Sequence, residues 1–169
     1  MGQLTRGAMI KIARRWLENT GCKVIATELS SSAIEKPDVV GWRTSGRCIV
    51  VQCEKSRGDF LANKKRYHHL TSDGVGMENW ILVPENVIEI DELPEGWGFL
   101  EYRVTAGASR SWMVKTMVHA PSVLRTEKAT KEEKKMLISV AWRALKAMEM
   151  VKPLGMGFDS EFSSESRPY

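Results

Sequence analysis

Three side chains that bind hard metal ions lie near the ends of two neighbouring apolar segments. Asp38 begins the segment 37–42, and Gln52 and Glu54 end the segment 48–54. If the two segments are antiparallel neighbours joined by a turn near Ser45-Gly46, residue 38 pairs near residue 53 or 54. Two carboxylates and an amide oxygen are then close together, and this donor set suits Mg²⁺ or Mn²⁺. Such an ion polarises a phosphoryl oxygen and lowers the pKa of a bound water.

The alternation within 48–54 sorts its side chains onto two faces. Ile49, Val51 and Cys53 share one face, and Gln52 and Glu54 share the other. The apolar face predicts a core contact, and the polar face predicts that Gln52 and Glu54 project together into a cleft or solvent. An ordinary interpretation remains open, because polar residues at strand ends are usually solvated and Asp after Pro is often a turn residue.

The elements that position these residues follow from periodicity and turn signals. We expect a single domain over 1–150, with a mixed central sheet flanked by helices in the α/β class. The first three strands form an antiparallel meander. A capping box at Thr130–Glu133 starts the last helix, which buries a stripe of Leu137, Val140, Ala141, Ala144 and Met148. The expected helices cover 3–20, 57–70 and 130 onward, the expected strands cover 22–29, 37–42, 48–54, 80–84, 98–104 and 111–119, and 151–169 is a flexible tail.

Composition excludes several classes of protein. The 169 residues are 43% hydrophobic and 27% charged, which is ordinary for a globular chain. No apolar run reaches membrane-spanning length, and basic residues interrupt the N-terminus, so we expect neither a membrane protein nor a secreted one. The three cysteines form no CxxC pair and fit a cytoplasmic protein. The net charge of +4 slightly favours an anionic partner. A homodimer is compatible with the sequence.

Aromatic and basic residues are candidates for core positions or for contacts with nucleic acid. Trp16, Trp112 and Trp142 fall in periodic segments, which predicts core positions. Trp42 and Trp97 lie beside glycines, where packing is favoured over base stacking. The basic run 63–69 follows the candidate site closely. It is either a helix that contacts phosphates through Lys64, Lys65 and Arg66 or a solvated helix face.

Three segments, "EKPDVVGW", "CIVVQCEKSRGDFLANKK" and "LPEGWGFLEY", together resemble the PD-(D/E)xK nuclease superfamily. More narrowly, they resemble a subgroup of small phage and bacterial proteins with a Ser-Arg-x-Asp-Phe-Leu segment, and the resemblance covers about residues 8–121. It implies a restriction-endonuclease-like fold, cleavage of DNA phosphodiesters with Mg²⁺ or Mn²⁺, and a location in the cytoplasm, or in the host cytoplasm for a phage protein. It makes Asp38 a metal ligand, Glu28 an accessory acidic residue and Arg57 a phosphate contact. Asp59 is then a candidate cap of the following helix.

The sequence departs from the superfamily at the centre of the motif. The expected Glu-x-Lys falls on Gln52-Cys53-Glu54. One hypothesis is a rearranged active site in which Glu54 binds metal or accepts a proton, and Lys55, Lys64 or Lys65 replaces the missing positive charge. The alternative is a catalytically degenerate relative that binds DNA or a partner protein as an inhibitor or scaffold. An RNA-directed nuclease is a third, remote hypothesis.

Overall fold

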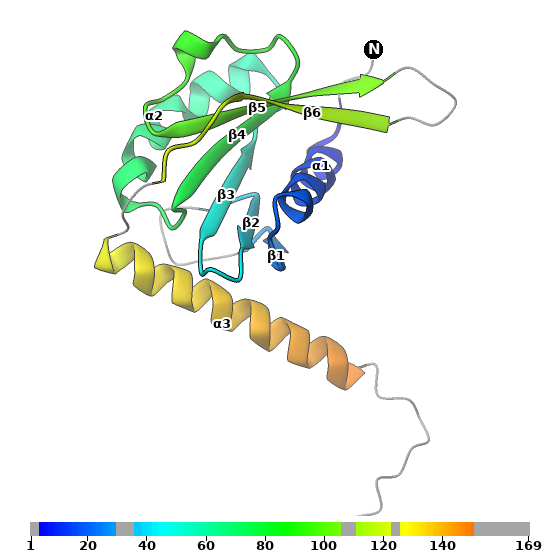
Figure 1. Cartoon of the computed structure of the whole chain (residues 1–169), viewed down its shortest axis with the longest axis vertical. Helices are drawn as coiled ribbons and strands as arrows, with labels where there is room; N and C mark the ends of the chain where they lie inside the picture. Colours follow the sequence, from blue (N-terminus) through cyan, green and yellow to red (C-terminus); the bar gives the residue numbers. More distant parts are fainter. Residues whose placement is uncertain (1–3, 30–35, 106–110, 123–125, 151–169) are drawn as a thin grey trace, which may run out of the picture.

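A six-stranded mixed sheet with three helices forms the part of the protein that the structure describes (Figure 1). The computed structural model describes residues 4–29, 36–105, 111–122 and 126–150. The strands follow one another across the sheet in chain order, β3 to β5 are parallel, and the remaining pairs are antiparallel. The predicted α/β domain with a mixed central sheet flanked by helices is confirmed, whereas the expected tail lies outside the described residues. The elements are α1 (Arg6–Asn19), β1 (Val24–Thr27), β2 (Val39–Trp42), β3 (Cys48–Cys53), α2 (Arg57–Asp73), β4 (Glu78–Pro84), a 3₁₀ turn η1 (Ile90–Glu92), β5 (Trp97–Thr105), β6 (Ser111–Val118) and α3 (Glu127–Met150).

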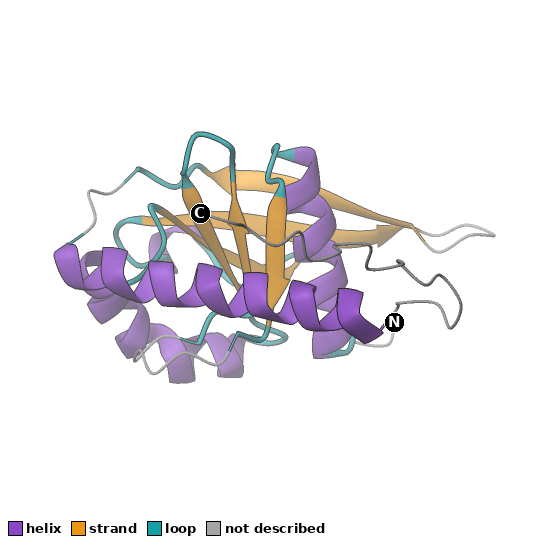
Figure 2. Ribbon diagram, turned by 90° about the horizontal axis from the view of Figure 1, so that it is seen from below, coloured by secondary structure: helices purple, strands orange, loops and turns teal. Residues whose placement is uncertain are grey.

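Helices cover the sheet on two sides, as the view in Figure 2 shows. The face of β3 that carries Ile49, Val51 and Cys53 packs against α1, as the alternation predicted. On the opposite face of the sheet, β4 and β5 pack against Phe60 and Tyr67 of α2, and Cys48 and Val50 of β3 pack with Met136 in the first half of α3. All six residues of β3 are buried. The strand that ends at the candidate site is therefore a central strand, and side chains on both of its faces lie in cores.

The predicted meander of the first three strands is confirmed. Val39 pairs with Val51 and Trp42 with Cys48, and the turn that joins β2 to β3 closes through the Gly46 N–H and the Arg43 carbonyl, 2.9 Å apart. Continued by one residue, this register sets Asp38 level with Gln52. The expected pairing with residue 53 or 54 was therefore wrong by at least one residue, although Asp38 still lies at the end of β3.

The last helix begins earlier than predicted. Thr126 Oγ1 accepts the backbone N–H of Ala129 at 3.1 Å, so Thr126 caps α3. The Thr130 hydroxyl donates instead to the Thr126 carbonyl at 3.1 Å, and the capping box predicted at Thr130 is wrong. A hydroxyl that bonds to the carbonyl four residues back is typical of a threonine inside a helix.

The predicted buried stripe of α3 is only partly correct. Leu137 and Val140 pack partly buried against the core, whereas Ala141, Ala144 and Met148 are exposed, because α3 extends past the sheet after its first half. Trp142 and Trp112, predicted to be core residues, are 60% and 45% exposed. Trp42 and Trp97 are buried, as predicted, and Trp16 packs partly buried against the core. Among the described residues, no helix is long and apolar enough to cross a bilayer.

Candidate functional site

Asp38 is held at the sheet end by hydrogen bonds to both carboxylate oxygens. It follows Pro37 and immediately precedes β2. Its Oδ2 accepts the backbone N–H of Cys53 at 2.8 Å, and its Oδ1 accepts Nε of Arg6 at 3.1 Å and Nη2 of the same guanidinium. The residue is 5% exposed. Burial of a carboxylate is costly unless charged or polar groups compensate it, and these donors provide that compensation.

Glu54 lies at the end of β3 and faces α2. Its backbone N–H donates to the Leu82 carbonyl at 3.0 Å, so the pairing with β4 continues to the residue after the strand. Its Oε1 accepts Asn63 Nδ2 at 3.0 Å and the hydroxyl of Tyr67. Burial raises the pKa of the Glu54 carboxyl, while the Tyr67 and Asn63 hydrogen bonds and the charge of Arg6 lower it by less. Burial also raises the pKa of Tyr67, and the Glu54 charge raises it further, so the phenol remains a donor.

Gln52 is almost completely buried, at 1% exposure, and its Nε2 has no hydrogen-bond partner among the described residues. The prediction that Gln52 and Glu54 project into a cleft or solvent was wrong, because α2 packs over this face of the sheet and leaves Glu54 only 3% exposed. A buried amide nitrogen without a partner is uncommon in a folded protein. The Nε2 of Gln52 is therefore a polar atom at this strand end whose hydrogen-bonding capacity is left unused.

Arg6 is a site residue that the sequence reasoning missed. It is the first residue of α1, its side chain is 50% exposed, and it pairs with Asp38. Burial opposes the charge of the guanidinium, but Asp38 and, more weakly, Glu54 outweigh this effect, so the pKa of Arg6 rises. A usable signal was present. The first turn of α1 contains no acidic residue, and a cation there opposes the helix dipole unless an anion compensates it.

Asn63 and Tyr67 are further missed residues, four positions apart on one face of α2. Tyr67 is fully buried, with its ring centroid 4.8 Å from that of Trp97, so the hydroxyl is held in place by packing. The spacing of Asn63 and Tyr67 predicts that they share one face of the helix. That face contacts Glu54, the buried acid at the end of the preceding strand.

The start of α2 differs from the expectation. Ser56 Oγ accepts the Asp59 N–H at 3.2 Å, so Ser56 caps the helix and the capping role predicted for Asp59 was wrong. Arg57 forms two hydrogen-bonded contacts with Glu92 of η1, at 2.7 and 2.6 Å. Its predicted contact with a phosphate stays a prediction, and it requires that Arg57 leave this acidic partner.

The remaining predicted residues lie on elements next to the site. Glu28 is exposed, and its backbone N–H donates to the Asp38 carbonyl at 3.1 Å, so it borders the same sheet end. Lys55 is partly exposed in the turn before α2. Lys64 lies over the Phe60 ring at 5.8 Å and Arg66 over the Tyr67 ring at 5.9 Å, and Lys65 is exposed. Their roles stay predictions.

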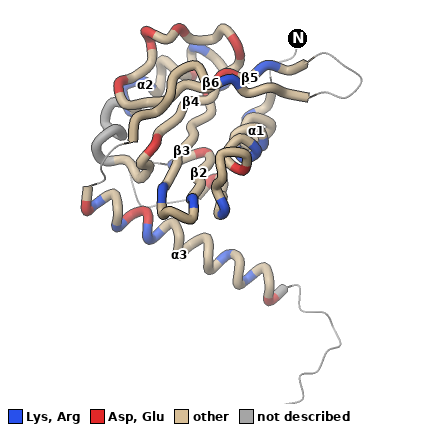
Figure 3. The backbone as a smooth tube through the Cα atoms, in the orientation of Figure 1, with Lys and Arg blue, Asp and Glu red and all other residues tan. Residues whose placement is uncertain are grey.

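Charges are distributed unevenly around the sheet (Figure 3). Helix α1 carries four basic residues, and the connection between β4 and β5 carries five acidic ones, one of which is Glu92. A polyanion is therefore attracted to the α1 side and repelled by the β4–β5 connection. The basic residues are Arg6, Lys11, Arg14 and Arg15, and the acidic ones are Glu85, Glu89, Asp91, Glu92 and Glu95.

Side chains with oxygen donors lie near one another at this sheet end. Within the described ranges, no three His, Cys, Asp or Glu side chains form a metal-binding group. The Asp38 and Glu54 carboxylates and the Gln52 amide supply oxygen donors, which Mg²⁺ prefers, and Mg²⁺ usually retains several waters. Arg6 is bonded to Oδ1 of Asp38, so an ion at that oxygen would take the place of the half-exposed guanidinium.

Comparison with known proteins adds information on the fold alone. No protein-family model matches the chain, and no curated protein does. A solved structure, the SPO1766 protein of unknown function from Silicibacter pomeroyi, is similar with a TM-score of 0.62 and 22% sequence identity. The match covers 94% of this chain and 99% of that one. The arrangement of strands and helices is thus shared with a second protein along nearly its whole length.

Proposed function

We propose that this protein is a Mg²⁺- or Mn²⁺-dependent nuclease that hydrolyses DNA phosphodiester bonds at the end of β3. The observation that supports this best is the meeting of two buried carboxylates, Asp38 and Glu54, with one half-exposed guanidinium, Arg6. Carboxylates that bind a metal ion or accept a proton, together with a further positive charge near the phosphate, favour metal-dependent phosphodiester hydrolysis. Asp38 and Gln52 would hold the ion, which when bound polarises the phosphoryl oxygen, and Glu54 lies beside them as the proton acceptor.

Glu54 has the properties of a general base in this proposal. Its raised pKa makes it a better proton acceptor than an ordinary solvated carboxylate. Tyr67 and Asn63 both donate to Oε1, and so they fix the orientation of the group. In this role Glu54 takes the proton from the attacking water while Tyr67 and Asn63 act as positioning residues.

Arg6 supplies the positive charge that the motif lysine gives in the nucleases this sequence resembles. Among the described residues it is the cation hydrogen-bonded to Asp38, whereas Lys64 lies over the Phe60 ring and Lys65 is exposed. A guanidinium that leaves Asp38 for a phosphate keeps its charge at the same strand end and binds the phosphate in a bidentate manner.

A groove between α1 and β6 gives a path for the nucleic acid. It has a volume of about 430 Å³, and Arg15, Asn19 and Trp112 line it together with apolar residues. Lys11 and Arg14 border Trp112 on the same side. Basic residues beside an exposed aromatic ring are typical of surfaces that bind single-stranded nucleic acid, and Arg6 extends this basic helix to the site.

The second candidate is a catalytically degenerate protein of the same fold that binds DNA or a partner without cleaving it. Two observations favour it. Gln52 brings no charge to the ion, and Arg6 already neutralises Asp38. In this alternative the groove and basic helix are retained for binding.

Purified protein incubated with supercoiled, linear and single-stranded DNA in Mg²⁺, Mn²⁺ or EDTA tests both candidates. The variants are Asp38→Asn and Glu54→Gln, which preserve shape and remove charge, and Asp91→Asn in η1 is the matched control. We expect cleavage with either ion, loss of cleavage in the two site variants, and normal cleavage in the control. Cleavage that survives in Asp38→Asn contradicts the site.

DNA binding without cleavage under either ion supports the second candidate instead. The double variant Gln52→Glu with Glu54→Lys then restores the usual arrangement of the motif. Cleavage created by this variant means that the native site is a weakened form of the active one. Absence of both cleavage and DNA binding in the folded wild-type protein contradicts the nuclease and leaves, of the second candidate, only the binding of a partner protein.

A further inference from the structure

Helix α3 carries two apolar stripes on different sides, and the fold uses one of them. Ala129, Met136 and the partly buried Val140 face the domain. Ile138 is two residues after Met136, which turns it about 200° around the helix, and it is 68% exposed. The stripe that it begins continues along the helix as Ile138, Ala141, Trp142, Leu145 and Met148.

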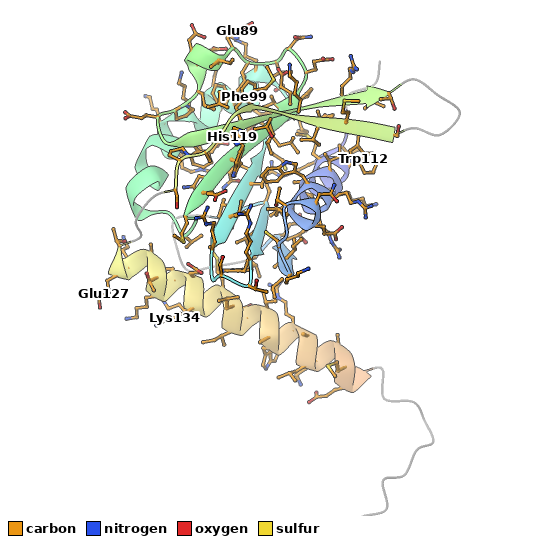
Figure 4. All side chains as sticks on the ribbon, viewed as in Figure 1. Glu89, Phe99, Trp112, His119, Glu127 and Lys134 are labelled. Carbon is orange, nitrogen blue, oxygen red and sulfur yellow. The ribbon has the colours of Figure 1, made fainter. Side chains whose placement is uncertain are left out.

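This outer stripe is exposed along its whole length. Ile138, Trp142, Leu145 and Met148 are 68%, 60%, 60% and 70% exposed, and every residue from 141 to 149 is exposed. Figure 4 shows the side chains of this half of α3 pointing into open space, beyond the labelled Lys134. Large apolar patches of this kind mark interaction surfaces, and the spacing of 138, 141, 145 and 148 is the a/d spacing of a coiled coil.

We propose that this outer stripe pairs two copies of the chain through antiparallel packing of α3 against α3. In an antiparallel pair centred near residue 143, Ile138 faces Met148 of the second copy, and Ala141 faces Leu145 of the second copy. Each Ala141–Leu145 pair places a small side chain against a large one, as close packing requires. A parallel pair would set Ala141 against Ala141 and leave a gap.

The charges beside the stripe are also self-complementary. Lys135, Trp142 and Glu149 lie on one flank at intervals of seven residues. In the antiparallel pair, Lys135 lies beside Glu149 of the second copy. By symmetry, Glu149 lies beside Lys135 of the second copy at the other end of the pair. Trp142 then meets the Trp142 ring of the second copy at the two-fold axis. Flanking charges of this kind set partner and orientation in coiled coils.

The proposed contact is compatible with the domain. The surface that Ile138 occupies faces away from the sheet that Met136 packs against, so a second helix covers α3 from outside. The outer stripe extends over about 15 Å of one helix, so the contact is small beside a standard interface, which buries about 800 Å² per partner. We therefore expect a dimer whose population depends on protein concentration in the micromolar range.

Sedimentation equilibrium of the full chain over a concentration series measures this association. Wild-type protein is expected to dimerise, and Leu145→Glu to weaken association about a hundredfold. Met113→Glu is the control, because Met113 is 55% exposed on β6, away from α3. Circular dichroism of each variant confirms that the chain is folded.

A charge exchange tests the orientation. Lys135→Glu and Glu149→Lys each weaken association, and the double variant restores it. Within one chain the two residues lie about 21 Å apart along the helix, so restoration reports a contact between copies. In a second test, chains with Ile138→Cys and chains with Met148→Cys are expected to form a disulfide with each other more readily than with themselves.

Three outcomes overturn the proposal. The first is a wild-type chain that stays monomeric at all concentrations. The second is dimerisation that Leu145→Glu leaves unchanged. The third is a monomer that binds vesicles of anionic lipid in a flotation assay and loses this binding in Leu145→Glu, because the stripe would then contact a membrane surface.

Discussion

The guanidinium of Arg6 and the carboxylate of Asp38 form an ion pair that joins the first turn of α1 to the residue before β2, 32 positions along the chain. Asp38 in turn accepts the Cys53 N–H at the end of β3. One carboxylate thus connects the helix, the meander and the central strand. Because Arg6 is half exposed, we propose that this pair opens toward a phosphate and is the movable part of the site.

Replacement of Arg6 by alanine tests whether this movable charge acts in catalysis. If the protein is the proposed nuclease, Arg6→Ala lowers the rate of DNA cleavage about a hundredfold, the effect of removing a donor that stabilises developing charge. It also exposes Oδ1 of Asp38, so Mg²⁺ binds more tightly in isothermal titration. Arg6→Lys restores part of the cleavage rate.

Arg143→Ala is the control for the Arg6 variants, because Arg143 is an exposed residue of α3 that belongs neither to the site nor to the groove. We expect its cleavage rate to stay within about twofold of wild type, since exposed side chains away from a site contribute little. An Arg6→Ala protein that cleaves as fast as wild type would rule out the proposed role of the guanidinium.

The buried Glu54 carboxyl predicts how stability depends on pH. Its pKa is raised in the folded state, chiefly by burial, so the folded protein binds this proton more readily than the unfolded chain does. The stability that this group contributes is full below its unfolded pKa, about 4.3, and is lost as pH rises through the folded value. Glu54→Gln removes this titration and keeps the shape.

Urea unfolding of wild type and Glu54→Gln between pH 4 and pH 8 measures the effect. The free energy of unfolding of wild type minus that of Glu54→Gln is expected to fall as pH rises. Tyr67→Phe removes a hydrogen bond that lowers the Glu54 pKa, so in that background the fall extends to higher pH. A difference that increases with pH would contradict the raised pKa.

The prediction from sequence succeeded where local alternation decides the outcome. Within β3, the two faces of the strand follow from the order of Ile49, Val51 and Cys53 and do not depend on distant residues. The meander and the position of Asp38 at the end of β3 follow from short turns. The sequence therefore predicted on which face of the sheet Gln52 and Glu54 lie. It did not predict that they are buried, because their burial depends on where α2 packs.

The missed residues were those whose partners are distant in the chain. The role of Arg6 requires that α1 begin beside β2, which only the packed sheet determines. The exposure of Trp142 had a different cause. Both stripes of α3 have helical spacing, and periodicity alone does not say which of them meets the domain.

Gly98 on β5 tests how closely the sheet packs beside Trp80. A Cβ at this position would lie 2.4 Å from Cε3 of Trp80 and 2.7 Å from the backbone nitrogen of Ala120. Trp80 is buried with its ring centroid 5.0 Å from that of Trp16, so it has little room to move. Gly98→Ala is expected to lower the free energy of unfolding by about 1–3 kcal/mol.

Gly7→Ala is the matched control for the Gly98 variant. Gly7 lies in α1, and a Cβ there would have no atom within 4 Å. Because alanine is a better helix former, this variant is expected to be more stable by about 0.5–1 kcal/mol. Equal effects of the two substitutions in urea unfolding would contradict the close approach of Gly98 to Trp80.

Trp112 lies on the path proposed for the nucleic acid. It is 45% exposed at the start of β6, beside Lys11, Arg14 and Arg15 of α1. Stacking of a base on an aromatic ring contributes about 1–3 kcal/mol, so Trp112→Ala is expected to weaken binding of single-stranded DNA about tenfold in fluorescence anisotropy. The neighbouring Met113, 55% exposed, points to the other face of the strand. Met113→Ala should therefore bind like wild type, and equal losses in the two variants would place the nucleic acid elsewhere.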